Sequence, residues 1–288
     1  MTTCSSYFIW DMKARKLEVS VVSDFHLATR ACKAKTILKY LKSINPGILV
    51  LNGDIIDSWR FSRNYFPKPQ LKVVRQIIKM LEKGVHVFYI TGNHDEFLRK
   101  FNQTEIGKLK IVNQLVLELD GKKTWIFHGD LYDHIIHKAK WLAKIGAAAY
   151  GLLTVINYGI NFLLRPLGVK EFILYKSLKK KNMNDSRPTA YEKAIAATTA
   201  ARGFQTVICG HTHVPKDKIV MMPGAPIRYI NCGDWVENFT AAEYADGKWE
   251  LHYFEDSGEE NTADEPDIPD HKQVYQSLFR ELAMANCL

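Results

Sequence analysis

Residues 17–26 read LEVSVVSDFH, a run of β-forming residues that ends in an aspartate, a phenylalanine and a histidine. Four later apolar runs also end in polar residues, at Gly53-Asp54, Gly92-Asn93-His94-Asp95, His128-Gly129-Asp130 and Gly210-His211-Thr212-His213. Runs with apolar residues at helical spacing separate the first three strands. Strands alternating with helices predict an α/β sandwich of mixed sheets. In such folds the carboxyl ends of the strands converge on one crevice, where we expect the five segments to meet.

The period of the apolar residues predicts the individual elements. We expect strands at residues 17–23, 48–52, 86–91, 205–209, 227–232, 239–244 and 249–254, and a hairpin of strands at 115–119 and 123–127. Helices are expected at 33–43, 71–83 and 191–202. Asn45-Pro46-Gly47 has the composition of a turn, which would separate the first helix from the second strand.

Composition places the chain among ordinary globular proteins. It has 288 residues, of which 47% are hydrophobic and 24% charged. The five cysteines are scattered and form no C-x-x-C pair, which argues against a disulfide framework or a thiolate zinc site and fits a reducing compartment. The first 17 residues contain Asp11, Lys13, Arg15 and Lys16 and no continuous apolar run, so no signal peptide is predicted.

The five segments together contain enough metal-binding side chains for two adjacent ions. Carboxylate, imidazole and amide oxygen are ligands that Mn²⁺, Fe²⁺ and Zn²⁺ accept. Asp54 is the best candidate for a carboxylate that bridges two cations, and Gly53 before it allows close approach of the backbone. The pattern predicts metal-assisted hydrolysis by seven ligands: Asp24, His26, Asp54, Asn93, His128, His211 and His213.

The order and content of these segments resemble the five signature motifs of the calcineurin-like metallophosphoesterase superfamily, over residues 19–235. The resemblance implies a four-layer α/β/β/α sandwich and two divalent ions, Mn²⁺ first, with Fe²⁺ or Zn²⁺ as alternatives. It implies one ion held by Asp24, His26, Asp54 and His213, and another held by Asp54, Asn93, His128 and His211. It also implies that His94, paired with Asp95, is a catalytic group and not a ligand.

The fourth and fifth motifs are separated by a basic insertion. Residues 145–164 carry no charge and are long enough to span a bilayer. A span there would place two motifs of one active site on opposite sides of the membrane, so we interpret the segment as a helical lid. A hairpin dipping into the membrane and a helical subdomain packed on the core stay open. The predicted domains are a core at 1–132 and 189–254, a lid at 133–188, and an acidic tail and C-terminal segment at 255–288.

A further resemblance concerns the substrate. Residues 54–59 (DIIDSW), the basic insertion and residues 231–237 (NCGDWVE) resemble the UDP-2,3-diacylglucosamine diphosphatase branch. That resemblance implies hydrolysis of a nucleotide-linked diacyl sugar to UMP and diacylglucosamine 1-phosphate at the cytoplasmic face of the inner membrane. An anionic membrane surface is then a predicted partner, because cationic residues flank the uncharged run. The predicted substrate contacts are Trp59, Arg60, Lys176 and Lys179.

One residue departs from that branch, whose members carry arginine where this chain has His94. A titratable group thus replaces a fixed cation, and another lipid-linked phosphate or pyrophosphate, or another phosphodiester or nucleotide, fits as well. A nucleic-acid partner is not predicted, because aromatic residues do not interleave with the cations. A non-catalytic scaffold on this fold would be expected to have lost ligands. The sequence predicts no oligomeric state.

Overall fold

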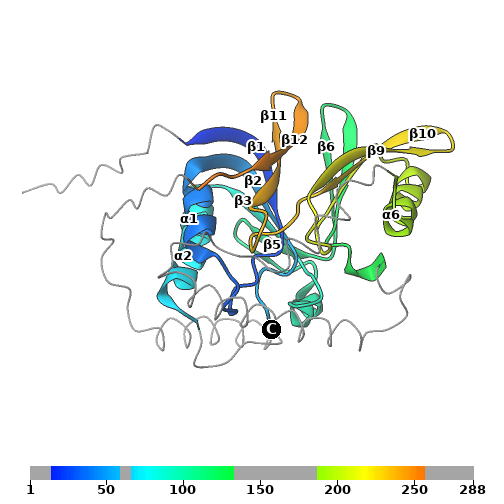
Figure 1. The fold of residues 1–288 in the computed structure, drawn as a ribbon. Coiled ribbons are helices and arrows are strands. Elements are labelled where there is room, and N and C mark those ends of the chain that lie inside the picture. The colour runs from blue at the N-terminus through cyan, green and yellow to red at the C-terminus, as the bar shows by residue number, and fades with distance from the viewer. Residues whose placement is uncertain (1–13, 59–65, 133–186, 257–288) are drawn as a thin grey trace, which may run out of the picture. The chain divides into compact units, whose positions relative to one another are not determined.

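The computed structural model describes residues 14–58, 66–132 and 187–256. Two sheets form the centre of the fold (Figure 1). The seven-stranded sheet has the order β12-β11-β1-β2-β3-β5-β4, and the five-stranded sheet has the order β6-β7-β8-β10-β9. The strands of the first sheet are β1 (Arg15–Val22), β2 (Ile44–Asn52), β3 (His86–Ile90), β4 (Glu105–Ile106), β5 (Leu109–Val112), β11 (Thr240–Ala245) and β12 (Lys248–Tyr253). Those of the second are β6 (Leu115–Leu119), β7 (Lys122–Ile126), β8 (Thr206–Cys209), β9 (Lys216–Met222) and β10 (Ala225–Asn231).

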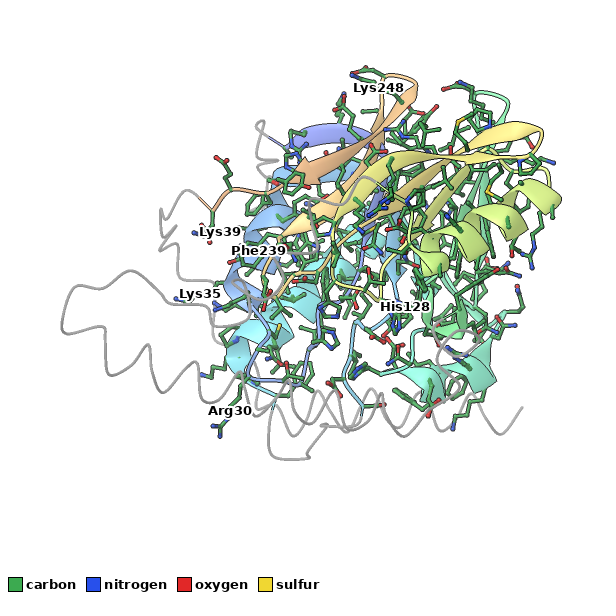
Figure 2. The ribbon with its side chains drawn as sticks, turned by 45° about the vertical axis from the view of Figure 1, so that its right-hand side comes forward. Arg30, Lys35, Lys39, His128, Phe239 and Lys248 are labelled. Atoms are coloured by element: carbon green, nitrogen blue, oxygen red, sulfur yellow. The ribbon has the colours of Figure 1, made fainter. Side chains whose placement is uncertain are left out.

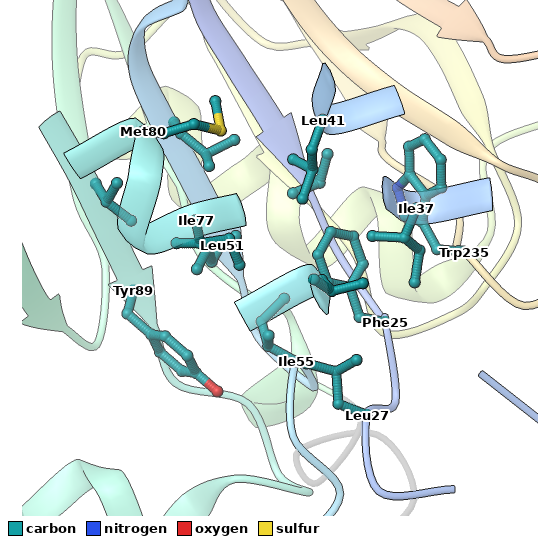
Figure 3. Packing of buried hydrophobic residues seen from close by; sticks show 14 of the residues in the cluster. Phe25, Leu27, Ile37, Leu41, Leu51, Ile55, Ile77, Met80, Tyr89 and Trp235 are labelled. Atoms are coloured by element: carbon teal, nitrogen blue, oxygen red, sulfur yellow. The ribbon is translucent and has the colours of Figure 1, made fainter. Parts of the chain in front are cut away.

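Helices cover the outer face of each sheet. The described helices are α1 (Ala34–Ser43), α2 (Lys68–Glu82), the short 3-10 helix η1 (Glu96–Phe101) and α6 (Ala190–Ala201). In the first apolar cluster, Ile37 of α1 and Ile77 of α2 pack with Leu51 of β2 (Figure 3). In the third cluster, Ile195 of α6 packs with Val207 of β8.

A second apolar cluster lies between the two sheets. It joins Val21 and Val50 of the seven-stranded sheet to Ile126, Ile208 and Ile230 of the five-stranded sheet. Because side chains alternate across a strand, β2 can send Val50 to this cluster and Leu51 to the helices. The three clusters separate four layers, so the predicted α/β/β/α sandwich of mixed sheets is confirmed.

The expected elements all occur, and two details of the prediction are wrong. Asn45-Pro46-Gly47 is no turn, because it belongs to β2, where residues 44–46 pair with residues 15–17 of the parallel strand β1. A proline near the start of a strand leaves the rest of the ladder intact. Helix α2 begins three residues earlier than expected, at Lys68, with Pro67 as its N-cap.

Within the described residues, no helix is long and apolar enough to cross a membrane. The uncharged run at 145–164 lies outside the described residues, as do residues 133–186 of the proposed lid. The domain boundaries therefore stay predictions.

Helix α6 is fixed to strand β9 by one buried carboxylate. Glu192 accepts a hydrogen bond from the backbone N–H of Thr189 at 2.9 Å, and its own N–H donates to the Thr189 hydroxyl at 3.2 Å, which forms a capping box. The same carboxylate receives Lys216 Nζ at 2.8 Å and pairs with Lys218. Burial raises the pKa of Glu192, but the hydrogen bonds from Lys216 and Lys218 outweigh it and leave that pKa below its ordinary value.

We expect Glu192→Gln to lower the free energy of unfolding by about 2 kcal/mol at neutral pH, because two partly buried ammonium groups lose their counter-charge. A carboxylate whose pKa is lowered by folding stabilises the protein above its unfolded pKa and loses that effect as the pH falls through its folded pKa. The difference between parent and variant should therefore shrink below a pH of about 4.3. Denaturant unfolding across this range measures it, and a difference that stays constant into acid would contradict the assignment.

Candidate metal centre

All five motifs lie at the carboxyl ends of strands, as predicted. Asp24 follows β1, Asp54 follows β2, Asn93 follows β3, and the fourth and fifth motifs follow β7 and β8. The backbone bends sharply there. Five of the seven predicted ligands have left-handed φ angles: Asp24 (58°), His26 (50°), Asp54 (54°), His211 (65°) and His213 (55°). Non-glycine residues rarely adopt this conformation, and such strain gathers at functional sites.

Apolar neighbours hold these strained loops in place. Phe25 and Leu27 flank His26 along the chain, and both are buried in the first apolar cluster, as is Ile55 after Asp54 (Figure 3). The loops of the first two motifs also join each other, since His26 N–H donates to Asp54 O at 3.0 Å. Core packing therefore fixes the backbone from which the ligands project.

The glycines beside the ligands leave room for them. A Cβ on Gly53 would lie 2.3 Å from His128 Nδ1, and one on Gly92 would lie 2.3 Å from Asp54 Oδ1. A Cβ on Gly210 would lie 2.7 Å from Asp24 Oδ2. Each glycine of these three motifs is thus required by a ligand from a different motif, which explains why Gly recurs beside the predicted ligands.

A first group of donors consists of Asp24, His26 and His213. Asp24 Oδ1 lies 3.1 Å from His213 Nε2 and 3.8 Å from His26 Nε2. The other carboxylate oxygen, Oδ2, accepts hydrogen bonds from the Ser23 hydroxyl and from the backbone N–H of His211, the latter at 3.1 Å. These contacts direct Oδ1 at the two imidazoles, which are themselves 3.3 Å apart between their Nε2 atoms.

A second group consists of Asp54, His128 and His211. His128 Nε2 lies 3.2 Å from Asp54 Oδ2, and His128 Nδ1 is held 2.9 Å from the carbonyl oxygen of Asn52. A carbonyl acceptor at one ring nitrogen fixes the orientation of the other, as in histidine ligands generally. Figure 2 labels His128 in the interior of the fold.

The two groups fit divalent cations. Asp24 Oδ1, Asn93 Oδ1 and His128 Nε2 are buried and make no hydrogen bond within the described ranges. Two of these atoms belong to the six donors of the two groups, and the third belongs to Asn93. A buried polar atom without a hydrogen bond costs about 1–3 kcal/mol, and a bound cation would remove that cost. Oxygen and nitrogen donors of this kind suit divalent metals.

Opposite charges within the centre also shift its pKa values. Burial raises the pKa of Asp24, but the His213 imidazole outweighs burial and brings that pKa down to about 2. Burial likewise opposes the charge on Asp54, yet the nearby His128 holds the pKa of Asp54 well below its ordinary value. Burial lowers the pKa of His128, and the Asp54 carboxylate raises it well above 6.5. The low pKa values keep the carboxylates of Asp24 and Asp54 ionised, as carboxylate ligands of a cation must be, whereas a cation at His128 would displace the proton of that imidazole.

The predicted pairing of His94 with Asp95 is wrong. Asp95 turns away and accepts hydrogen bonds from Gly92 N–H at 2.5 Å, Ile55 N–H at 3.0 Å and the Tyr89 hydroxyl at 2.6 Å. It braces the loops of the second and third motifs. Burial, followed by the charge of Asp54, raises the pKa of Asp95 to about 6.

The carboxylate beside His94 is Asp57. His94 Nδ1 lies 3.1 Å from Asp57 Oδ2, and His26 Nδ1 lies 3.8 Å from the same oxygen. Asp57 thus lies behind one predicted ligand and the predicted catalytic histidine. The hydrogen bonds of His94 and His26 lower the pKa of Asp57 against the effect of burial.

Sequence reasoning also missed two other charged residues near the centre. Asp234 Oδ2 lies 3.6 Å from His213 Nδ1. Arg99 donates to Asp130 and so ties η1 to the fourth motif. Asp57 and Asp234 lie in residues 54–59 and 231–237, which resemble the UDP-2,3-diacylglucosamine diphosphatase branch. That resemblance was a feature of the sequence that could have identified them as site residues. Four predicted substrate contacts, Trp59, Arg60, Lys176 and Lys179, lie outside the described residues.

Residues 17–215 match the sequence model of the calcineurin-like phosphoesterase family, and this range contains all five motifs. The chain belongs to this family. It is therefore a metal-dependent hydrolase, as the ligand set predicts. Among relatives, the UDP-2,3-diacylglucosamine hydrolase of Stenotrophomonas maltophilia (strain K279a) is 26% identical over 248 residues, covering 80% of this chain and 96% of its own. That of Neisseria meningitidis serogroup B is 27% identical over 245 residues, covering 78% of this chain and 93% of its own.

The contacts of Asp57 with His26 and His94 give this carboxylate a positioning role in the phosphoesterase. We expect Asp57→Asn to lower kcat about 10- to 100-fold, because the carboxylate that orients His26 and His94 is lost while its shape is kept. Phosphodiester kinetics and metal analysis on the same preparation measure the effect. Full metal content with an unchanged kcat would show that Asp57 does not position these imidazoles.

Proposed function

We propose that this phosphoesterase hydrolyses a lipid-linked phosphate or pyrophosphate, and that UDP-2,3-diacylglucosamine, split into UMP and diacylglucosamine 1-phosphate, is the substrate that fits best. The observation that carries the hydrolytic part is the pair of three-donor groups, which contain buried donor atoms without hydrogen bonds. The substrate part is supported by relatives named UDP-2,3-diacylglucosamine hydrolase that align with about four fifths of the chain. The uncharged run at 145–164, between Lys144 and Arg165, suits acyl chains.

The proposed cofactors are two divalent cations, Mn²⁺ first, with Fe²⁺ or Zn²⁺ as alternatives. Asp24, His26 and His213 would hold one, Asn93, His128 and His211 the other, and Asp54 would contact both. When bound, such ions supply an activated water and positive charge at the phosphoryl oxygens. Asp54 suits the shared role because its carboxylate lies 3.2 Å from His128 Nε2, and because the charges of His94 and His26 also lower its pKa.

His94 is proposed as the proton donor or phosphoryl-binding group. Its backbone N–H donates to Asp54 Oδ1 at 2.8 Å, and its ring Nδ1 faces Asp57. Its Nε2, 4.0 Å from Asp54 Oδ2, is then turned toward the metal centre. An imidazole held at one nitrogen can present the other to a departing oxygen, which is the geometry of general acid catalysis.

We also propose that the enzyme works at the cytoplasmic face of the membrane as a peripheral protein. Substrate contacts at Trp59, Arg60, Lys176 and Lys179 are part of this proposal. Nucleic acid is not a proposed partner.

A product assay tests the proposal. With Mn²⁺ present, we expect UMP and diacylglucosamine 1-phosphate from UDP-2,3-diacylglucosamine, and far slower release of UMP from UDP-N-acetylglucosamine, which lacks the acyl chains whose binding energy would be used for catalysis. Hydrolysis of a small aryl phosphodiester serves as a control for the metal centre. Activity on the aryl ester without UMP release from the diacyl substrate would favour the second candidate, a phosphoesterase for another phosphodiester or nucleotide.

A further inference from the structure

The loop between β10 and β11 lies against the fifth motif. It begins after Asn231, the last residue of β10, whose side chain is fully buried. The Nδ2 of this amide donates to the carbonyl oxygen of Gly210 at 2.7 Å and to the hydroxyl of Thr212 at 3.1 Å. Its Oδ1 accepts from the Gly233 N–H at 2.9 Å. One side chain therefore joins the fifth motif, on both sides of His211, to the start of this loop.

Asp234 is at the centre of the loop and is also fully buried. Its Oδ1 accepts hydrogen bonds from the backbone N–H groups of Val236 at 2.8 Å, Glu237 at 2.6 Å and Asn238 at 3.3 Å. An aspartate that accepts from N–H groups a few residues further along the chain stabilises a turn and is itself held in place. The second carboxylate oxygen, Oδ2, consequently has a fixed direction.

That second oxygen faces His213, one of the predicted ligands. Asp234 Oδ2 lies 3.6 Å from His213 Nδ1, while His213 Nε2 lies 3.1 Å from Asp24 Oδ1 in the first donor group. The amide of Asn238 joins the two, because its Nδ2 donates to Asp234 Oδ2 at 2.5 Å and to His213 O at 2.9 Å. The imidazole therefore directs Nε2 at the first donor group and Nδ1 at a buried negative charge.

The same loop is joined to the first motif. Trp235 N–H donates to Asp24 O at 3.2 Å. The indole of Trp235 is fully buried and meets the ring of Phe25 edge to face, with 5.9 Å between the ring centroids (Figure 3). The loop thus contacts Asp24 and His213, which are two of the three members of the first donor group.

We propose that Asp234 is a positioning residue for the first cation and acts through His213; this rests on the proposed function, which assigns that ion to the first donor group. A cation at Nε2 leaves the imidazole proton on Nδ1, where the charge of Asp234 stabilises it and holds the ring in its orientation. Loss of this charge weakens the first ion more than the other, because the third and fourth motifs supply ligands to the other ion from separate loops.

Equilibrium dialysis of the metal-free, full-length protein against Mn²⁺ or Zn²⁺, followed by metal analysis, tests the role of Asp234. We expect the parent to bind two ions. Asp234→Asn should bind one ion like the parent and the other about 10- to 100-fold more weakly. Asparagine keeps an oxygen for the three N–H groups and places an NH₂ group, in place of a negative charge, opposite His213 and Asn238.

Thr240→Val is the matched control. Thr240 Oγ1 donates to Cys232 O, a buried contact that supports the base of the same loop and does not involve the fifth motif. The substitution removes this hydrogen bond and should lower the thermal unfolding temperature, while both ions bind as in the parent.

A second variant keeps the proposal testable if Asp234→Asn does not fold. Asn238→Ala, at a half-buried position, leaves the charge of Asp234 in place and removes the amide that joins it to His213. It should weaken one ion about tenfold.

Parental affinity for both ions in Asp234→Asn and Asn238→Ala would overturn the proposal. So would a weakening by Thr240→Val as large as that by Asp234→Asn, because the loop would then act only through its stability. A parent that binds fewer than two ions would refute the two-ion centre of the proposed function, and the role of Asp234 with it. No substrate is present, so failure of the proposed lipid substrate would leave the result standing.

Discussion

Asp54→Ala is expected to abolish hydrolysis, with a loss in kcat of about a thousandfold or more, because Asp54 is proposed to contact both cations. The carboxylate lies 3.2 Å from His128 Nε2 and 4.0 Å from His94 Nε2, so it is the residue that joins the second donor group to the proposed acid. Its removal should also lower the metal content. Kinetics with an aryl phosphodiester and metal analysis on the purified variant measure both effects.

The fold should survive this change. The backbone around Asp54 is held by Ile55 in the apolar core and by the hydrogen bond from His26 N–H, neither of which needs the carboxylate. Thermal unfolding checks this, and Glu118→Ala, an exposed carboxylate on β6, is the control. An Asp54→Ala protein that kept most of its activity with a parental metal content would refute the shared role of Asp54.

The short apolar runs with clear ends were sufficient to predict an α/β sandwich of mixed sheets, and the four layers were predicted from the resemblance of the motifs to a known superfamily. The sequence was insufficient for β4, β5 and β9, for which no strand was predicted. Strand β9 exposes Ile219 and Met221, at 55% and 75% of their full accessibility, and buries Val220 on its other face. Such a strand has a weak apolar pattern and is stabilised by pairing with β10. Strand β4 has two residues, which are too few to show an alternation of apolar and polar side chains.

The predicted ligands at the strand ends could be found from local sequence, and the partner of His94 could not. Each ligand follows an apolar run directly, so its position could be deduced from local sequence. The partner of His94 could not be deduced in this way, because Asp95, its neighbour in sequence, turns back to Gly92 and Ile55. Asp57 reaches His94 from the loop after β2. A contact between two loops depends on the left-handed bends at their bases, which local sequence does not specify.

Gly92→Ala is the second change with a large expected effect. The added Cβ would lie 2.3 Å from Asp54 Oδ1 and 2.6 Å from the backbone nitrogen of Asp54. The carboxylate could rotate away from its proposed ligand position, but the backbone nitrogen cannot yield without moving the loop after β2. We expect a loss of about 1–3 kcal/mol in unfolding free energy from overpacking, together with loss of metal binding and of nearly all hydrolysis.

Gly107→Ala is the matched control, since a Cβ there meets nothing within 4 Å and the cost comes only from its left-handed φ of 58°. That substitution should lower stability by about 1 kcal/mol and leave hydrolysis unchanged. The comparison separates instability from damage to the centre, because both variants are destabilised and only Gly92→Ala displaces a proposed ligand. If Gly92→Ala bound metal and hydrolysed phosphodiesters like Gly107→Ala, the close approach of Asp54 to Gly92 would have no part in forming the centre.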